Sequence, residues 1–107
     1  MRVIKATVDE KLSIVDVDFN NMDTVYKEIG GFEVVRTSAL RSFFHGPVVM
    51  IVDDNGWAKL KEFNPVASAF YGGPGIVGDV LFVLEEFGEF VDFDDVDATY
   101  EYMNSLL

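Results

Sequence analysis

The sequence predicts an α+β domain with a mostly antiparallel sheet of about six or seven strands and two or three helices, the last of them amphipathic and C-terminal. Three observations lead to this prediction. Apolar segments of strand length recur along the chain, glycine- and asparagine-rich turns separate them, and few segments have helical spacing. With 107 residues, half of them hydrophobic, the chain is long enough for one core, so residues 1–107 are expected to form a single domain.

The first two predicted strands follow from the alternation of apolar and polar residues. Residues 2–8 place Ile4 and Ala6 on one face, which is typical of a half-buried strand. Residues 12–18 alternate in the same way, with aspartates on the polar face. We expect these two strands to pair across Asp9–Lys11.

Two internal segments have helix signals. Residues 22–29 have apolar side chains at the i, i+3, i+4 and i+7 spacing of a helix, between a cap at Asn20-Asn21 and a stop at Gly30-Gly31. Residues 65–71 follow Asn64, which is a good N-cap, and begin with a proline at the first helical position. We therefore predict a helix over each segment.

The middle of the chain combines a strand, a loop and a hairpin. Residues 32–37 predict a third strand, and residues 38–46 lack a clear period and are expected to form a loop. Asp54-Asn55-Gly56 is a strong hairpin signal, because Asn-Gly tolerates the positive φ angles of a type I′ turn. Residues 48–52 and 57–60 are therefore expected to pair.

The C-terminal third of the chain combines a buried strand, a hairpin and a helix. Residues 76–84 are nearly all apolar, which is typical of a central strand covered on both faces. Residues 89–93 are expected to pair with it across Phe87-Gly88. The final helix is predicted after Asp94-Asp95 from the spacing of four apolar residues, Val96, Tyr100, Met103 and Leu107.

The order of several structural motifs points to a family. The motifs are Gly30-Gly31-Phe32-Glu33-Val34-Val35, the Asp54-Asn55-Gly56 turn, Asn64-Pro65 followed by Ala67, Ile76-Val77-Gly78-Asp79 and Gly88-Glu89-Phe90. In this order they resemble the uncharacterised domain-of-unknown-function family DUF3846 of short phage and mobile-element proteins, in which an arginine follows the asparagine where this chain has Pro65. The resemblance implies a setting, a phage or mobile element in the bacterial cytoplasm, and no particular activity.

Composition excludes several classes of protein. Eight basic and nineteen acidic residues give a net charge of −11, which argues against direct binding to nucleic acid and against docking on anionic lipid. With no cysteine, the chain has no disulfide, zinc-thiolate site or cysteine nucleophile. No signal-peptide pattern is present, and no apolar run approaches the roughly 20 residues of a membrane-spanning helix. We therefore expect a cytoplasmic protein that does not enter the membrane.

The acidic residues are unevenly distributed. Residues 1–62 hold all eight basic residues and ten acidic ones, whereas residues 63–107 hold nine acidic residues and no basic one. One interpretation is a solvated acidic face. The other is a negative surface that docks on a host or phage protein with a basic surface, because complementary fields speed encounter. The candidate partner-binding residues are Asp79, Glu85, Glu86, Glu89, Asp92, Asp94, Asp95, Asp97 and Glu101.

Other chemistries find less support in the sequence. The acidic run Asp92–Asp97 is not an EF-hand, since position 12 counted from Asp92 is Met103 rather than glutamate. The glycines of Gly72–Gly75 follow a predicted helix instead of opening one, so they do not form a phosphate loop. His45 is the only histidine and no nucleophile signature accompanies it. The prediction is a protein without metal, cofactor or enzymatic activity.

The aromatic content suggests a further interface. Ten phenylalanines, four tyrosines and one tryptophan are many for a chain of this length. Those predicted at loops or element ends either close the core or form an exposed patch, for which a homodimer is the simplest use. These residues are Phe43, Phe44, Phe70, Tyr71, Phe87 and Phe90.

The function expected from the sequence is binding. The chain is predicted to be a small acidic phage-type accessory protein that binds a partner protein and so inhibits or decoys a nucleic-acid-binding host or defence protein. The alternative is a small-molecule-binding or sequestering homo-oligomer with a pocket near the glycine turn. An enzyme would instead need an acid–base or nucleophile pair to converge around His45.

Overall fold

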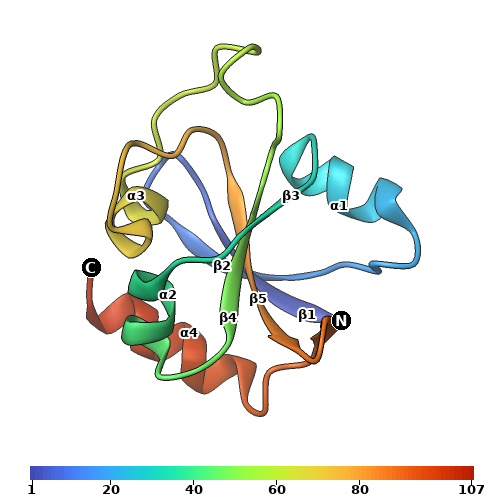
Figure 1. The fold of residues 1–107 in the computed structure, drawn as a ribbon, viewed down its shortest axis with the longest axis vertical. Coiled ribbons are helices and arrows are strands. Elements are labelled where there is room, and N and C mark those ends of the chain that lie inside the picture. The colour runs from blue at the N-terminus through green and yellow to red at the C-terminus, as the bar shows by residue number, and fades with distance from the viewer.

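The computed structural model describes all residues, 1–107, as six strands and four helices (Figure 1). In chain order the elements are β1 (Arg2–Ala6), β2 (Leu12–Asp16), α1 (Met22–Ile29), β3 (Glu33–Val35), α2 (Ser38–Phe44), β4 (Val48–Val52), α3 (Pro65–Tyr71), β5 (Val80–Glu86), β6 (Glu89–Val91) and α4 (Val96–Ser105). The predicted α+β class with its C-terminal helix is confirmed. None of the four helices has the length and apolarity needed to cross a membrane.

The sheet has the order β2-β1-β5-β4-β3, and every pair of neighbours is antiparallel. β5 is its centre, as the apolar run over residues 76–84 predicted. Phe82 pairs with Ile4 of β1 on one side and with Met50 of β4 on the other. β6 pairs with the last residues of β5, through Leu84 and Val91, on the edge that β1 has left free. The predicted hairpin across Phe87-Gly88 is confirmed.

Both faces of the sheet are covered, which gives the domain two apolar clusters. The larger cluster lies under α2, α3 and α4 and includes Phe82, Leu40 and Met103. The smaller cluster lies under α1 and includes Val25 and Ile29. Figure 1 shows α1 on one side of the sheet and the other three helices on the opposite side. Because side chains alternate along a strand, β4 and β5 supply residues to both clusters, and this explains their continuous apolar sequences.

Two predictions in the middle of the chain are wrong. Residues 57–60 form turns rather than a strand paired with 48–52. β4 already has β3 along one edge and β5 along the other, so it has no free edge for a hairpin partner. Residues 38–44 form α2 instead of a loop, since Thr37 accepts a hydrogen bond from the Leu40 N–H and caps the helix. The structure therefore has four helices.

Candidate functional site

The structure separates two of the nine candidate acidic residues from the others. Asp79 lies before β5, where its carboxylate accepts a hydrogen bond from the Val8 N–H and lies 3.8 Å from the Lys5 ammonium. Glu86 ends the same strand, so at about 3.3 Å per residue the two acids are roughly 23 Å apart. Glu85 accepts two hydrogen bonds from Arg36, of 2.7 and 2.6 Å. Neither Asp79 nor Glu85 is free for a partner.

The ion pair of Glu85 is a structural contact. The Glu85 side chain is only 14% exposed, and the hydrogen bonds from Arg36 hold the pKa of its carboxyl below the ordinary value despite this burial. Arg36 lies just beyond β3, so its guanidinium joins the edge of the sheet to β5. A bidentate pair of this kind fixes both side chains.

The remaining candidates lie along the C-terminal part of the chain and are exposed. Asp95 caps α4 by accepting a hydrogen bond from the Ala98 N–H, and Asp97 lies 3.6 Å from Arg2. The other acids have no cation within ion-pair distance: Glu86, Glu89, Asp92, Asp94 and Glu101. We call these five residues, together with Asp97, the acidic surface.

The fold brings three members of the acidic surface, Glu86, Glu89 and Asp94, to the side of the sheet that α2, α3 and α4 cover. Glu86 and Glu89 pair directly across the β5–β6 hairpin. By alternation Glu86 lies on the same face as Leu84, which packs against the cluster under α2, α3 and α4. Leu84 in turn lines a shallow depression together with Asp94. The end of the hairpin and the start of α4 therefore form adjoining parts of one negative surface.

The tip of the β5–β6 hairpin is apolar. Phe87 and Gly88 connect the strands, both with positive φ (+53° and +80°), as in a type I′ turn. The Phe87 side chain is fully exposed. A Cβ on Gly88 would have no atom within 4 Å, so the tip stands clear of the rest of the protein.

Most of the other aromatic residues expected at element ends close the core. Phe70 is buried, and Phe44, Tyr71 and Phe90 pack against the two clusters. Phe43 is partly exposed, with its ring centroid 5.2 Å from that of Phe70. Phe87 is the exception among the six.

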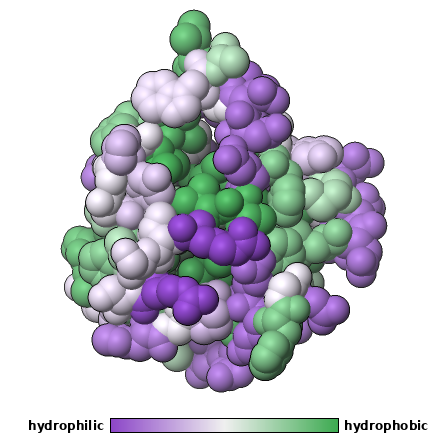
Figure 2. Space-filling view, viewed as in Figure 1, coloured by the Kyte–Doolittle hydropathy of each residue, from purple (hydrophilic) through white to green (hydrophobic).

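A second apolar surface was not predicted, because it lies on residues 57–60, which were expected to form a strand. Trp57 and Leu60, 70% and 89% exposed, lie on the loop between β4 and α3. This loop protrudes at the top of Figure 1, and Figure 2 shows hydrophobic residues at the same place. The only sequence signal for this surface was the pair of large apolar residues three positions apart beside the Asn55-Gly56 turn.

The same loop is fixed at its base by a buried carboxylate. The Asp53 side chain is fully buried and accepts hydrogen bonds from Lys59 and from the Asn55 N–H, both at 2.8 Å, and it lies 2.7 Å from the Lys61 ammonium. Burial alone would raise the pKa of Asp53, but the hydrogen bonds from the two lysines outweigh it and hold the pKa well below the ordinary range.

The two lysines also bind the end of α1. Lys59 donates to the Gly30 carbonyl (2.9 Å) and Lys61 to the Ile29 carbonyl (2.7 Å), at the helix terminus where carbonyl groups lack partners and cations are favourable. At Gly78 a Cβ would lie 2.8 Å from Lys61 Cδ, so the absence of a side chain there lets the lysine pass. The loop is therefore tied to both α1 and the start of β5.

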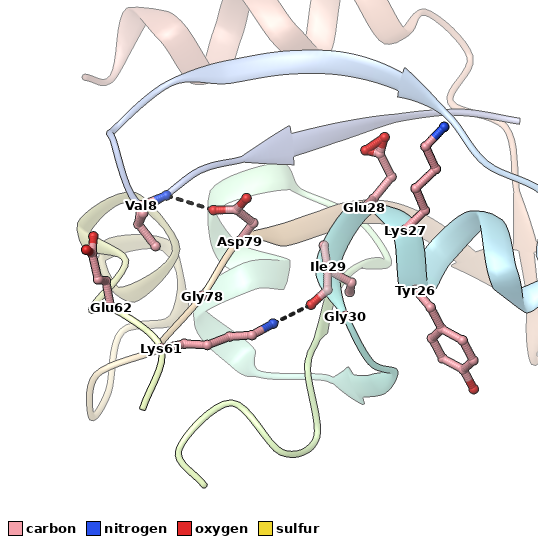
Figure 3. Close-up of a pocket in the computed structure, with 10 residues that line it drawn as sticks. All are labelled: Val8, Tyr26, Lys27, Glu28, Ile29, Gly30, Lys61, Glu62, Gly78 and Asp79. Carbon is pink, nitrogen blue, oxygen red and sulfur yellow. Dashed lines mark hydrogen bonds between the residues drawn. The ribbon is translucent and has the colours of Figure 1, made fainter. Parts of the chain in front are cut away.

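A polar cleft of about 360 Å³ lies beside Lys61, between α1 and the start of β5 (Figure 3). In Figure 3 the Lys61 side chain extends toward the Ile29 carbonyl and Asp79 accepts from the Val8 N–H. Lys5, which lies next to Asp79, is also 3.4 Å from Glu28. The charged groups around this cleft mostly neutralise one another.

The residues considered for catalysis and metal binding do not converge. His45 is the exposed C-cap of α2, with φ of +50°, and its imidazole makes no hydrogen bond within the protein. No three histidine, cysteine, aspartate or glutamate side chains lie where they could together hold a metal ion. In the glycine turn, Gly75 lies against the ring of Phe63, and Gly72 approaches the Cβ of Ala39. The polar cleft does not lie at this turn, because the glycines that line it are Gly30 and Gly78.

The Asn64-Pro65 motif has a structural explanation. Asn64 is fully buried; its side-chain oxygen accepts from the Ala67 N–H (2.9 Å), and its amide donates to the carbonyls of Ala6 (3.1 Å) and Gly78 (2.9 Å). This one side chain caps α3 and joins it to β1 and to the residues before β5. The predicted N-cap is confirmed, and its motif is an element of the fold.

Comparison with known proteins agrees with the sequence motifs. Neither the curated proteins nor the solved structures contain a match to this chain. The family model described as "Domain of unknown function (DUF3846)" matches residues 1–106, which is nearly the whole chain and more than the segment from Gly30 to Phe90 that carries the motifs. The chain therefore belongs to the DUF3846 family.

Proposed function

We propose that this protein is a non-catalytic binding module that docks through its acidic surface on a protein with a basic surface. In the setting implied by the sequence motifs, it is a phage-type accessory protein of the bacterial cytoplasm. A partner that normally binds nucleic acid fits best, because such a protein presents an array of lysine and arginine side chains spaced for phosphates. Occupation of that array would inhibit the partner or decoy it from nucleic acid.

One observation supports this function above the others. The five acids Glu86, Glu89, Asp92, Asp94 and Glu101 are exposed and unpaired, and no basic residue follows Lys61 in the sequence. A net charge of about 2–8 in magnitude suffices for the solubility of a small domain. The excess on one surface is typical of electrostatic steering toward a partner of opposite sign.

Charge reversal tests this proposal. The variant Glu86→Lys, Glu89→Lys, Asp92→Lys and Asp94→Lys reverses four of the six charges of the acidic surface. The matched control is Asp9→Lys, Glu10→Lys, Glu33→Lys and Glu62→Lys, whose acids are also exposed and unpaired and whose change in net charge is the same. Each tagged variant is used to capture partners from bacterial lysate.

The first variant should lose the captured protein and the control should retain it, with both still folded by circular dichroism. Equal capture by the two variants would contradict docking through the acidic surface. Equal loss from both would assign the interaction to net charge alone, which also contradicts the proposal.

The polar cleft supports a second candidate function, the binding of a small polar ligand. Its volume of about 360 Å³ is within the range of ligand sites, and Lys61 and Asp79 line it. A ligand of this kind would raise the unfolding temperature of the protein, because binding to the folded state alone stabilises it. A panel of nucleotides and amino acids in a thermal-shift assay tests this function, and Gly78→Ala, which crowds Lys61, should remove any shift observed.

A further inference from the structure

We infer that the contact with the basic partner is centred on Phe87, whose ring enters an apolar pocket rimmed by lysine and arginine side chains. This inference rests on the proposed function and adds to it the anchor residue and the chemistry of the pocket. Aromatic side chains at the centre of an interface, surrounded by polar contacts, commonly contribute most of its binding energy. Phe87 has the exposure and the position that such an anchor requires.

Phe87 contributes nothing visible to the fold. Its side chain is fully exposed, and it does not belong to either apolar cluster. By contrast, Phe90 in the same hairpin packs against Phe19, with ring centroids 4.4 Å apart. The hairpin is therefore held to the domain by Phe90, while Phe87 is presented to solvent.

The turn chemistry at Phe87 is also unfavourable for folding. Its φ of +53° belongs to the left-handed region, which a bulky side chain adopts at a cost and which asparagine or glycine tolerates. The two-residue turn of the hairpin favours Asn-Gly, yet this chain has Phe87-Gly88 there and places its Asn55-Gly56 in a loop that is not a hairpin. Folding alone would favour asparagine at position 87.

The surroundings of Phe87 specify the chemistry of its pocket. Glu86 and Glu89 flank the turn and lie directly opposite each other, an arrangement of like charges that destabilises a hairpin. When the Phe87 ring enters the partner's pocket, the carboxylates of Glu86 and Glu89 on either side of the turn would lie at the rim of that pocket. Lysine and arginine at that rim would neutralise the pair, which supports a basic rim around an apolar centre.

The substitution Phe87→Asn separates binding from stability. It should raise the thermal unfolding midpoint by a few degrees, because asparagine suits the turn, and should reduce capture of the partner by about ten-fold or more. Leu60→Asn is the matched control, since Leu60 is also a highly exposed apolar residue with positive φ (+56°) and lies outside the acidic surface. It should raise the midpoint and leave capture unchanged. A Phe87→Asn protein that is less stable than the parent, or that captures as well, would overturn the inference.

Photocrosslinking makes the test direct. Benzoylphenylalanine is introduced at position 87, and separately at position 60, and the tagged proteins are irradiated in bacterial lysate. A crosslink from position 87, and none from position 60, to a basic protein that the acidic-surface variant fails to capture would support the inference.

Two other results would overturn the inference and would be distinguishable. Capture that depends on the acidic surface but gives no crosslink at position 87 would refute the anchor and leave the proposed function intact. Capture that is indifferent to both the acidic surface and Phe87 would refute both.

Discussion

Replacing Asn64 by alanine should be among the most destabilising polar substitutions in this protein. The change removes the cap of α3, worth about 1 kcal/mol, and two buried hydrogen bonds whose acceptors are left unsatisfied at about 1–3 kcal/mol each. The expected loss is therefore about 3–7 kcal/mol. Because small domains have a free energy of unfolding of about 5–15 kcal/mol, this is a large fraction of the total.

Equilibrium unfolding in urea measures this loss, with Asn21→Ala as the control. Asn21 occupies the N-cap position of α1 but makes no capping hydrogen bond, so its replacement should change the free energy of unfolding by less than about 0.5 kcal/mol. The Asn64→Ala protein should unfold at a urea concentration lower by more than about 1 M, with an unchanged slope. A loss below about 1 kcal/mol would refute the view that Asn64 joins α3 to the sheet.

The variant Asn64→Asp distinguishes the cap from the two donated hydrogen bonds. It keeps an acceptor for the Ala67 N–H but places a carboxylate opposite two carbonyl groups in a fully buried position. Burial raises the pKa of such a carboxyl in the folded state above its pKa in the unfolded state. The folded state therefore binds more protons, and the stability of the variant increases as the pH falls toward the pKa of the unfolded state. The deficit relative to wild type should therefore be smaller at pH 5 than at pH 7. A deficit independent of pH would mean that the carboxylate is solvated.

Three further predictions follow from the core and from the base of the loop. Gly31→Ala should destabilise the protein by about 1–3 kcal/mol, because its Cβ would lie 2.3 Å from the pinned carboxylate of Asp53, whereas Gly46→Ala, with its nearest atom at 3.7 Å, should be neutral in thermal unfolding. Asp53→Asn should lower the free energy of unfolding by about 2–3 kcal/mol at pH 7. Because the pKa of Asp53 is lowered in the folded state, the stability that its carboxylate provides is present above about pH 4 and disappears as the pH falls further. The urea unfolding curves of the variant and the wild type should therefore converge in acid. Phe82→Ala should cost about 3–5 kcal/mol in urea unfolding, because this fully buried ring lies at the centre of the larger cluster.

Local signals in the sequence were sufficient for much of the fold. The cap of α3 is made by adjacent residues, so Asn64-Pro65 was enough to predict it. The apolar run of β5 indicates a strand buried on both faces, and the spacing of α1 indicates a helix buried on one face. The pairing of residues 57–60 failed because it depends on whether β4 has a free edge, and only the complete sheet decides that. The helix α2 was missed because it is short and buries a single residue, Leu40, so its apolar period is weak.

The candidate site could be predicted only in part. Local sequence identified the acidic half of the chain, but the separation of Glu85 from Glu86 follows from strand alternation, which places Arg36 over one and solvent over the other. The distance between Asp79 and Glu86 follows from the extended conformation of β5, which begins at the residue after Asp79 and ends at Glu86. The exposure of Phe87 could be expected from its turn, whereas the tie between Asp53 and α1 joins distant segments and has no local signal.

The measurement that most directly tests docking through the acidic surface is capture from bacterial lysate at low and at high salt, followed by mass spectrometry. Exposed charges are screened beyond about 10 Å at 0.1 M salt, so an interaction made by the acidic surface weakens as salt increases. The account predicts one basic protein, retained by the wild type at low salt, released at high salt and absent from the variant that reverses Glu86, Glu89, Asp92 and Asp94. A protein retained equally at both salts and by that variant, or no enriched protein at either salt, would contradict it.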